Sequence, residues 1–151
     1  SSLLAIENTL AAMDDIPVAN GGRRIAVLGD ILALGDISEE THHQIAGVLA
    51  KHKVDLLLAY GINIRLTVED AAKLGIESKY FADRQKLEDE IRAVVKPEDL
   101  VLFKASHAVN LGSSIDRLFG TDIYLPTISS RQTPPTIICV SIISNLIFQI
   151  K

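Results

Sequence analysis

Two polar stretches each follow a run of apolar residues, and they carry the side chains best suited to chemistry. The first is Gly29-Asp30, after the apolar residues 25–28, and the second is Lys104-Ala-Ser-His107, after the apolar run 100–103. A carboxylate can orient a hydroxyl, an ammonium or a metal-bound water, whereas an ammonium, a hydroxyl and an imidazole suit the binding of a carboxylate or phosphate. Since ligands bind at the carboxyl ends of strands in open α/β sheets, both stretches can share one crevice.

Each stretch also has a purely structural interpretation, which the sequence leaves open. Asp30 can form a turn or cap a helix, and Lys104, Ser106 and His107 can belong to a polar loop that caps the last helix. The second stretch has no acidic partner nearby to build a Ser-His-Asp relay, so nucleophilic hydrolysis is not expected.

Two adjacent histidines, His42 and His43, lie in the helical pattern 38–52. His42 falls on the face that packs toward the sheet, so we interpret it as a core or interface histidine, and we predict that His43 faces solvent. Adjacent residues do not share a helix face as metal ligands four residues apart would. We assign no metal to either residue.

The usual nucleotide-binding loops are missing from the sequence. Gly29 and Gly35 are too far apart for a Gly-x-Gly-x-x-Gly fingerprint, and no Gly-x-x-x-x-Gly-Lys-Ser/Thr occurs. Any nucleotide contact must therefore be accessory, or the phosphate-binding machinery must lie on another chain segment.

Apolar strand-like runs alternate with helical patterns along most of the chain. We predict strands at residues 24–28, 54–60, 78–81 and 100–104. We predict helices at residues 2–13, 38–52, 66–74, 84–95 and 111–119. This alternation favours the α/β class, with a Rossmann-like, mostly parallel sheet flanked by helices and right-handed crossovers.

Composition narrows the class of protein. The chain has 151 residues, of which 48% are hydrophobic, and its net charge is −4. No basic run is longer than Arg23-Arg24, so we expect no binding to nucleic acid. A single cysteine, Cys139, excludes an intrachain disulfide and fits a reducing cytoplasm. The first residues lack the features of a signal peptide, and we interpret them as a cut end.

The last residues have a different character. From Ile123 onward there is no acidic residue, and prolines bracket a Ser/Thr-rich linker before a β-branched apolar run. That run is shorter than the roughly 20 residues of a membrane-spanning helix, so we predict no span. We interpret the run as one strand added at the sheet edge, with a poorly ordered, aggregation-prone appendage or a membrane contact as alternatives. The sequence thus predicts a domain at 1–122 and a tail at 123–151.

Taken together, these motifs resemble the C-terminal domain of the Mur ligases. That family's pattern reads Val-Leu-Gly-Asp-Met-x-Glu-Leu-Gly, then Ser-Glu-x-x-His, and later Lys-Gly-Ser-Arg/His-Gly-Met. This chain has Val-Leu-Gly-Asp-Ile-Leu-Ala-Leu-Gly at 27–35, Ser-Glu-Glu-Thr-His at 38–42 and Lys-Ala-Ser-His-Ala-Val-Asn at 104–110. The match extends from the first residue to about residue 122. It departs from the family at Ile31, Ala33, Ala105 and Asn110, the last standing where a basic residue is common.

The resemblance implies a chemistry that the composition does not show. Such ligases use ATP and Mg²⁺ to phosphorylate a peptide carboxylate, and an incoming amine then displaces the phosphate. The pattern is most similar to the branch that adds D-Ala-D-Ala to a UDP-N-acetylmuramoyl-tripeptide in the synthesis of peptidoglycan precursors. In these ligases the C-terminal domain swings in to complete the active site.

Carried over by position, the resemblance assigns roles to individual residues. Asp30 and Gly35 would face the closing active site, and Lys104, Ser106 and His107 would face the incoming dipeptide or the nucleotide. Asn110 lies on the same loop and is assigned to the same substrate or nucleotide site.

The P-loop and the nucleotide-sugar site of such ligases lie in other domains. The chain by itself is therefore expected to be inactive and to bind neither ATP nor Mg²⁺ tightly. Two alternatives stay open at this point. The chain can be the C-terminal domain of a sister ligase, such as another Mur enzyme or folylpolyglutamate synthase, or a stand-alone Rossmann-like ligand-binding or interaction module.

Overall fold

The computed structural model describes residues 2–18, 20–119, 136–140 and 147–150, and for the last two segments the backbone only. Five α-helices lie in the described residues: α1 (Leu3–Asp14), α2 (Ser38–Lys51), α3 (Ile64–Lys73), α4 (Arg84–Val94) and α5 (Leu111–Phe119). Two 3₁₀ turns precede α2 and α5: η1 (Gly35–Ile37) and η2 (His107–Val109). The predicted helices are thus confirmed, with bounds that differ by no more than a few residues.

The described strands form one six-stranded sheet in the order β3-β2-β1-β4-β5-β6. Its strands are β1 (Arg24–Gly29), β2 (Leu56–Tyr60), β3 (Glu77–Phe81), β4 (Leu100–Lys104), β5 (Thr136–Val140) and β6 (Ile147–Ile150). All neighbouring pairs are parallel except β5 with β6, which is antiparallel. The predicted α/β class with a mostly parallel sheet is confirmed.

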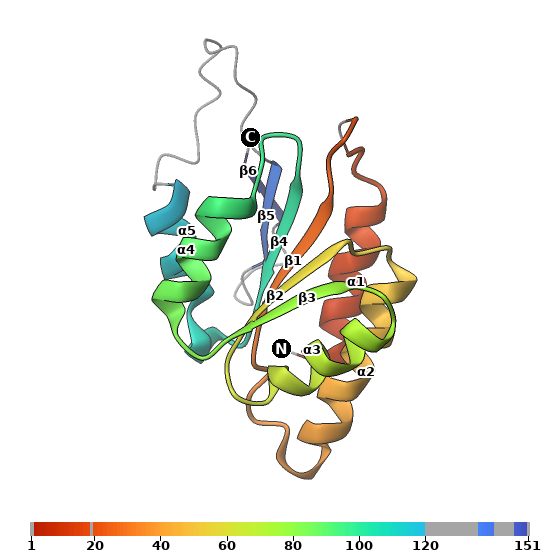
Figure 1. Cartoon of the computed structure of the whole chain (residues 1–151). Coiled ribbons are helices and arrows are strands. Elements are labelled where there is room, and N and C mark those ends of the chain that lie inside the picture. The colour runs from red at the N-terminus through yellow and green to blue at the C-terminus, as the bar shows by residue number, and fades with distance from the viewer. Residues whose placement is uncertain (1, 19, 120–135, 141–146, 151) are drawn as a thin grey trace.

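Helices cover both faces of this sheet (Figure 1): α1, α2 and α3 lie on one face, and α4 and α5 lie on the other. Because successive strand residues point to opposite faces, each central strand contributes to two cores. One core joins the first three helices to Ala26, Leu28, Leu57, Ala59, Leu100 and Leu102. The other joins α4 and α5 to Ile25, Val27, Leu56, Leu58, Val101 and Phe103.

Strand β2 begins later than the sequence predicted. Val54 is buried in the core, but its N–H donates to the carbonyl of Leu49 and so closes the end of α2. Lys53 before it has a left-handed backbone conformation, with φ of 56°. The apolar character of residue 54 therefore reflects core packing at a helix end and not strand pairing.

The tail contains two strands where the sequence predicted one. Strand β5 pairs with residues 100–103 of β4, and β6 then pairs with β5. The physical reason is that an edge strand leaves unpaired N–H and C=O groups, which a second extended segment can satisfy. The predicted linker and the boundary at residue 122 lie outside the described residues. In the part of the chain that the structure describes, no helix is long and apolar enough to cross a membrane.

One ion pair joins the segments before β1 and β4 at the amino edge of the sheet. The buried carboxylate of Asp99, just before β4, accepts hydrogen bonds from the backbone N–H, Nε and Nη2 of Arg23, at 3.0, 3.2 and 2.7 Å. Burial acts to raise the pKa of Asp99, but the bonds from Arg23 and from the N–H of Lys96 outweigh it and hold the pKa below its ordinary value.

We expect Asp99→Asn to lower the free energy of unfolding by about 2 kcal/mol at neutral pH, because it weakens charge-assisted hydrogen bonds to a buried group. The folded pKa lies below the unfolded one, so the carboxylate stabilises the fold above about pH 4 and loses this contribution as the pH falls through the folded pKa. Urea unfolding at pH 7 and at successively lower pH should therefore show the variant and the wild type converging in acid. The matched control Glu98→Gln, at an exposed neighbour, should change little. Equal losses for both variants would contradict this account.

Candidate functional site

Three loops meet at the carboxyl edge of the sheet, and hydrogen bonds join them. The backbone N–H of Ser106, after β4, donates to the carbonyl of Asp30, after β1, at 3.1 Å. The hydroxyl of Ser106 accepts from the backbone N–H of Leu32 at 2.7 Å. The two polar stretches that the sequence singled out are therefore adjacent, as expected for neighbouring parallel strands.

The side chain of Asp30 joins the third loop, between β2 and α3. One of its oxygens accepts from the N–H of Ile62 at 2.9 Å and the other from the N–H of Ile64 at 2.8 Å. Asp30 is only 5% exposed, and the N-cap residue of α3, Asn63, makes no capping bond through its own side chain. The carboxylate thus caps α3 from a different loop, where the positive end of the helix dipole also favours its charge.

Glycines allow this close approach. Gly61 has φ of 141°, and a Cβ built on it would lie 2.4 Å from Oδ1 of Asp30. At the end of β1, a Cβ on Gly29 would lie 2.8 Å from side-chain carbons of Ala105 and Val109. Both distances are shorter than real Cβ contacts, so any side chain at either glycine would push the loops apart.

His42 lies beneath the loop after β1 and is fully buried. Its Nδ1 lies 2.7 Å from the carbonyl oxygen of Ser38, and its Nε2 lies 3.3 Å from the backbone N–H of Ile31. Because a carbonyl only accepts and an N–H only donates, the ring is neutral with its proton on Nδ1. The prediction of a core histidine is confirmed. His43 is 41% exposed, as predicted, and its Nδ1 contacts Asp70 at 2.5 Å.

The remaining predicted site residues differ in exposure. Lys104 ends β4 opposite Leu28 and is 3% exposed, and Ser106 is 8% exposed. His107 and Asn110 are exposed, on and just after the 3₁₀ turn η2. Gly35 is also exposed and opens η1 with φ of 57°, in the loop that follows β1.

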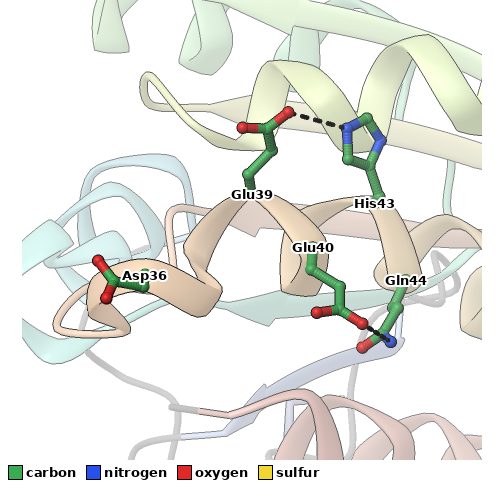
Figure 2. A pocket seen from close by; sticks show the side chains of 5 residues that line it. All are labelled: Asp36, Glu39, Glu40, His43 and Gln44. Atoms are coloured by element: carbon green, nitrogen blue, oxygen red, sulfur yellow. Dashed lines mark hydrogen bonds and ion pairs between the residues drawn. The ribbon is translucent and has the colours of Figure 1, made fainter.

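A surface pocket that the sequence did not indicate lies beside the start of α2 (Figure 2). It is lined by Asp36, Glu39, Glu40, His43 and Gln44. Figure 2 shows Glu39 beside His43, at 3.9 Å, and Glu40 beside Gln44, at 3.3 Å. None of the six residues assigned by the resemblance lines it.

Arg84, at the start of α4, is the residue at this edge that sequence reasoning missed. Its guanidinium donates to the carbonyls of Val109 and Asn110 and to the hydroxyl of Ser114, and it lies 4.9 Å from the ring centre of Tyr60. One signal was available, because a cation in the first turn of a helix opposes the helix dipole and so needs a reason to be there.

Comparison with known proteins places these features in one family. The sequence profile described as "Mur ligase, glutamate ligase domain" matches residues 2–107. UDP-N-acetylmuramoyl-tripeptide–D-alanyl-D-alanine ligases are similar to this chain in Synechocystis, at 30% identity over 75% of the chain, and in Bacillus subtilis, at 30% over 60%. The chain spans 25% and 20% of those two proteins.

A solved structure agrees with the sequence comparisons. The crystal structure of MurF ligase from Thermotoga maritima, in complex with ADP, superposes with a TM-score of 0.57 at 27% identity. The similarity covers 80% of this chain and 26% of that ligase.

We expect Asp30→Ala to lower the free energy of unfolding by about 2 kcal/mol, because two N–H groups at the start of α3 lose their acceptor. Urea unfolding monitored by circular dichroism measures this loss. Asp36→Ala provides a control at an exposed carboxylate nearby and should stay within about 0.5 kcal/mol of wild type. A wild-type midpoint for Asp30→Ala would show that the cap contributes nothing.

We expect Gly61→Ala to destabilise the chain more than Gly75→Ala does. Both glycines have positive φ, so each substitution strains the backbone, by about 1 kcal/mol at Gly75 and by more at Gly61, whose φ of 141° is adopted almost only by glycine. Only at Gly61 does the added Cβ also meet the carboxylate of Asp30, since the space around Gly75 is open. Parallel urea titrations of the two variants measure the difference, and equal losses would contradict the close contact.

Proposed function

Because the chain belongs to the Mur ligase family, whose glutamate ligase domain it contains, we propose that it is part of an ATP-dependent ligase that joins D-Ala-D-Ala to a UDP-N-acetylmuramoyl-tripeptide. The curated relatives carry the name of that reaction, which favours this branch over a sister ligase such as folylpolyglutamate synthase. Since ATP and UDP-linked precursors are cytoplasmic, the reaction would take place in the cytoplasm and would supply peptidoglycan precursors.

The single observation that supports a role for this chain is that hydrogen bonds join the loops at the carboxyl edge of the sheet. Hydrogen bonds hold the loop after β4 against the loop after β1, and this leaves His107 exposed. We propose that His107 and Asn110 contact the incoming dipeptide, with Lys104 adding positive charge at the base of the loop. A dipeptide presents a carboxylate, which imidazole and amide N–H donors can bind.

Asp30, Gly35 and Ser106 have a different role in this proposal. The carboxylate of Asp30 and the hydroxyl of Ser106 are used by backbone N–H groups of neighbouring loops. We therefore propose that these two residues set the shape of the site and do not touch the substrate. Gly35 supplies the left-handed turn that leads from the loop after β1 into α2.

The described residues of this chain do not fit a magnesium–ATP site. Among them, no group of three or more His, Cys, Asp or Glu side chains is arranged to hold a metal ion. Asp30, the carboxylate at the sheet edge, is already bonded through both oxygens. The ADP in the Thermotoga maritima ligase supports nucleotide use by a complete protein. We propose that ATP and Mg²⁺ bind mainly to parts of the ligase outside this chain, and that the chain by itself does not turn over ATP.

An assay of the complete ligase tests the proposed reaction. The purified protein is incubated with ATP, Mg²⁺, D-Ala-D-Ala and the UDP-N-acetylmuramoyl-tripeptide, and the mass of the product is measured by mass spectrometry. We expect the mass of the tripeptide precursor to rise by one dipeptide less one water. A parallel incubation contains glutamate and a folate in place of D-Ala-D-Ala and the tripeptide precursor, and product in that incubation alone would identify a sister ligase. No ATP-dependent product with either acceptor would refute the proposal.

In the complete ligase, we expect His107→Ala to raise KM for D-Ala-D-Ala about 10-fold, because a hydrogen bond to a charged group contributes roughly 1.5–3 kcal/mol. KM for the UDP-linked tripeptide should stay within about 2-fold, as expected for a contact made only with the dipeptide. Steady-state kinetics with each substrate varied in turn gives both values. His43→Ala is the matched control, since it removes an exposed imidazole that lies on α2, away from the loop of His107. Unchanged kinetics for His107→Ala would remove this residue from the site.

A further inference from the structure

The guanidinium of Arg84 joins the ends of three strands. Arg84 follows β3, its Cζ lies 4.9 Å from the ring centre of Tyr60 at the end of β2, and its donors reach the turn between β4 and α5. One Nη bonds the carbonyl of Asn110 at 2.8 Å and the hydroxyl of Ser114 at 3.2 Å, and the other Nη bonds the carbonyl of Val109.

The turn that Arg84 contacts has an uncommon backbone conformation. Asn110 has φ and ψ of 53°, a left-handed conformation that is costly for any residue but glycine, although asparagine tolerates it better than most. The carbonyls of Val109 and Asn110 follow one another at the end of η2, and that of Asn110 also accepts from the hydroxyl of Ser113 at 2.9 Å. A planar guanidinium can bond both carbonyls at once, which an ammonium on a flexible stem does less well.

Arg84 fixes one end of a loop whose other end is fixed by Ser106. At the amino end of the loop, the N–H of Ser106 donates to the carbonyl of Asp30, and the hydroxyl of Ser106 accepts from the N–H of Leu32. At the carboxyl end of the loop, the guanidinium of Arg84 donates to the carbonyls of residues 109 and 110. Between the two anchors lies the exposed His107. The position of its imidazole over the sheet edge therefore depends on both anchors.

We propose that Arg84 is a positioning residue for the dipeptide site: it holds the turn at 109–110 so that the loop at 105–110 is already ordered before the substrate binds. This inference rests on the proposed function of that loop. Preorganisation lowers the entropy that binding must overcome, so its loss should weaken binding of the dipeptide without removing any contact to it. Arg84 itself does not touch the substrate.

The chain offers a matched control for Arg84. Arg117 on α5 also joins α4 to α5, through two-pronged hydrogen bonds to the buried carboxylate of Glu88 at 3.0 and 2.6 Å. These bonds raise the pKa of Arg117 and lower that of Glu88. The side-chain bonds of Arg117 go to Glu88 and Ser113, so it reaches the loop at 105–110 only indirectly, through the hydroxyl of Ser113 that donates to the carbonyl of Asn110. Replacing either arginine removes a guanidinium from the same helix pair, but only Arg84→Ala removes hydrogen bonds made directly to the loop.

The test measures kinetics of the complete ligase with Arg84→Ala, Arg84→Lys and Arg117→Ala. We expect Arg84→Ala to raise KM for D-Ala-D-Ala about 10-fold, since displacement of a binding group by about 1 Å costs up to about 100-fold. KM for ATP and for the UDP-linked tripeptide should stay near wild type. Arg84→Lys should recover part of the loss, and Arg117→Ala should leave KM for the dipeptide unchanged. Equal effects of Arg84→Ala and Arg117→Ala on every substrate, or no effect of Arg84→Ala, would overturn the inference.

Amide hydrogen exchange of the 151-residue chain separates this inference from the proposed function. Without any substrate, Arg84→Lys should speed exchange at residues 105–111 by about 10-fold or more, while residues of β1 and α2 keep wild-type rates. If the ligase assay fails and the exchange effect is present, the proposed reaction is wrong but Arg84 still orders the loop. If exchange in the loop is unchanged in Arg84→Lys and in Arg84→Ala, the positioning role is refuted whatever the reaction. If Arg84→Ala fails to fold, the kinetic and the hydrogen-exchange measurements are both made with Arg84→Lys.

Discussion

The carboxyl edge of the sheet depends on how the buried carboxylate of Asp30 is satisfied. Burying a charged group is costly unless donors surround it, and here the donors are two backbone N–H groups at the start of α3. The carboxylate can reach them because Gly61 has no side chain. The same residue offers its carbonyl to Ser106, so one aspartate fixes the relative positions of three loops. The shape of the proposed site follows from this arrangement, in which each oxygen of Asp30 already accepts a backbone N–H.

Much of the fold was predictable because its signals are local. Each central strand is a short apolar run between helical patterns, and the strand predicted at 100–104 has the bounds of β4. The misplaced start of β2 came from Val54, whose burial is caused by packing at the end of α2 and not by strand pairing. The number of strands in the tail depends on which sheet edge stays open, and one sequence does not reveal that.

The candidate site was predictable in its location but not in its orientation. The sequence placed Asp30 and Ser106 after the carboxyl ends of two strands, where they could share a crevice, and the structure brings them together. It did not reveal that the carboxylate turns inward, because its donors are N–H groups more than 30 residues further along the chain. Arg84 was missed for the same reason, since its partners are carbonyl groups in the turn before α5. Every residue type has a backbone carbonyl, and all but proline have an N–H, so the sequence does not show which of these groups a polar side chain bonds. In the sequence, such a side chain cannot be told from one that binds a ligand.

The central claim is that the loops joined through Asp30 form the binding face for the dipeptide, and a hydrogen-exchange footprint of the complete ligase tests it most directly. Exchange would be followed with and without saturating D-Ala-D-Ala, in the presence of ADP, Mg²⁺ and the UDP-linked tripeptide. The account predicts that the dipeptide slows exchange at residues 105–111 and in the loop after β1, while the far ends of α2 and α4 keep their rates. Protection confined to other domains of the ligase, with these loops unchanged, would contradict it.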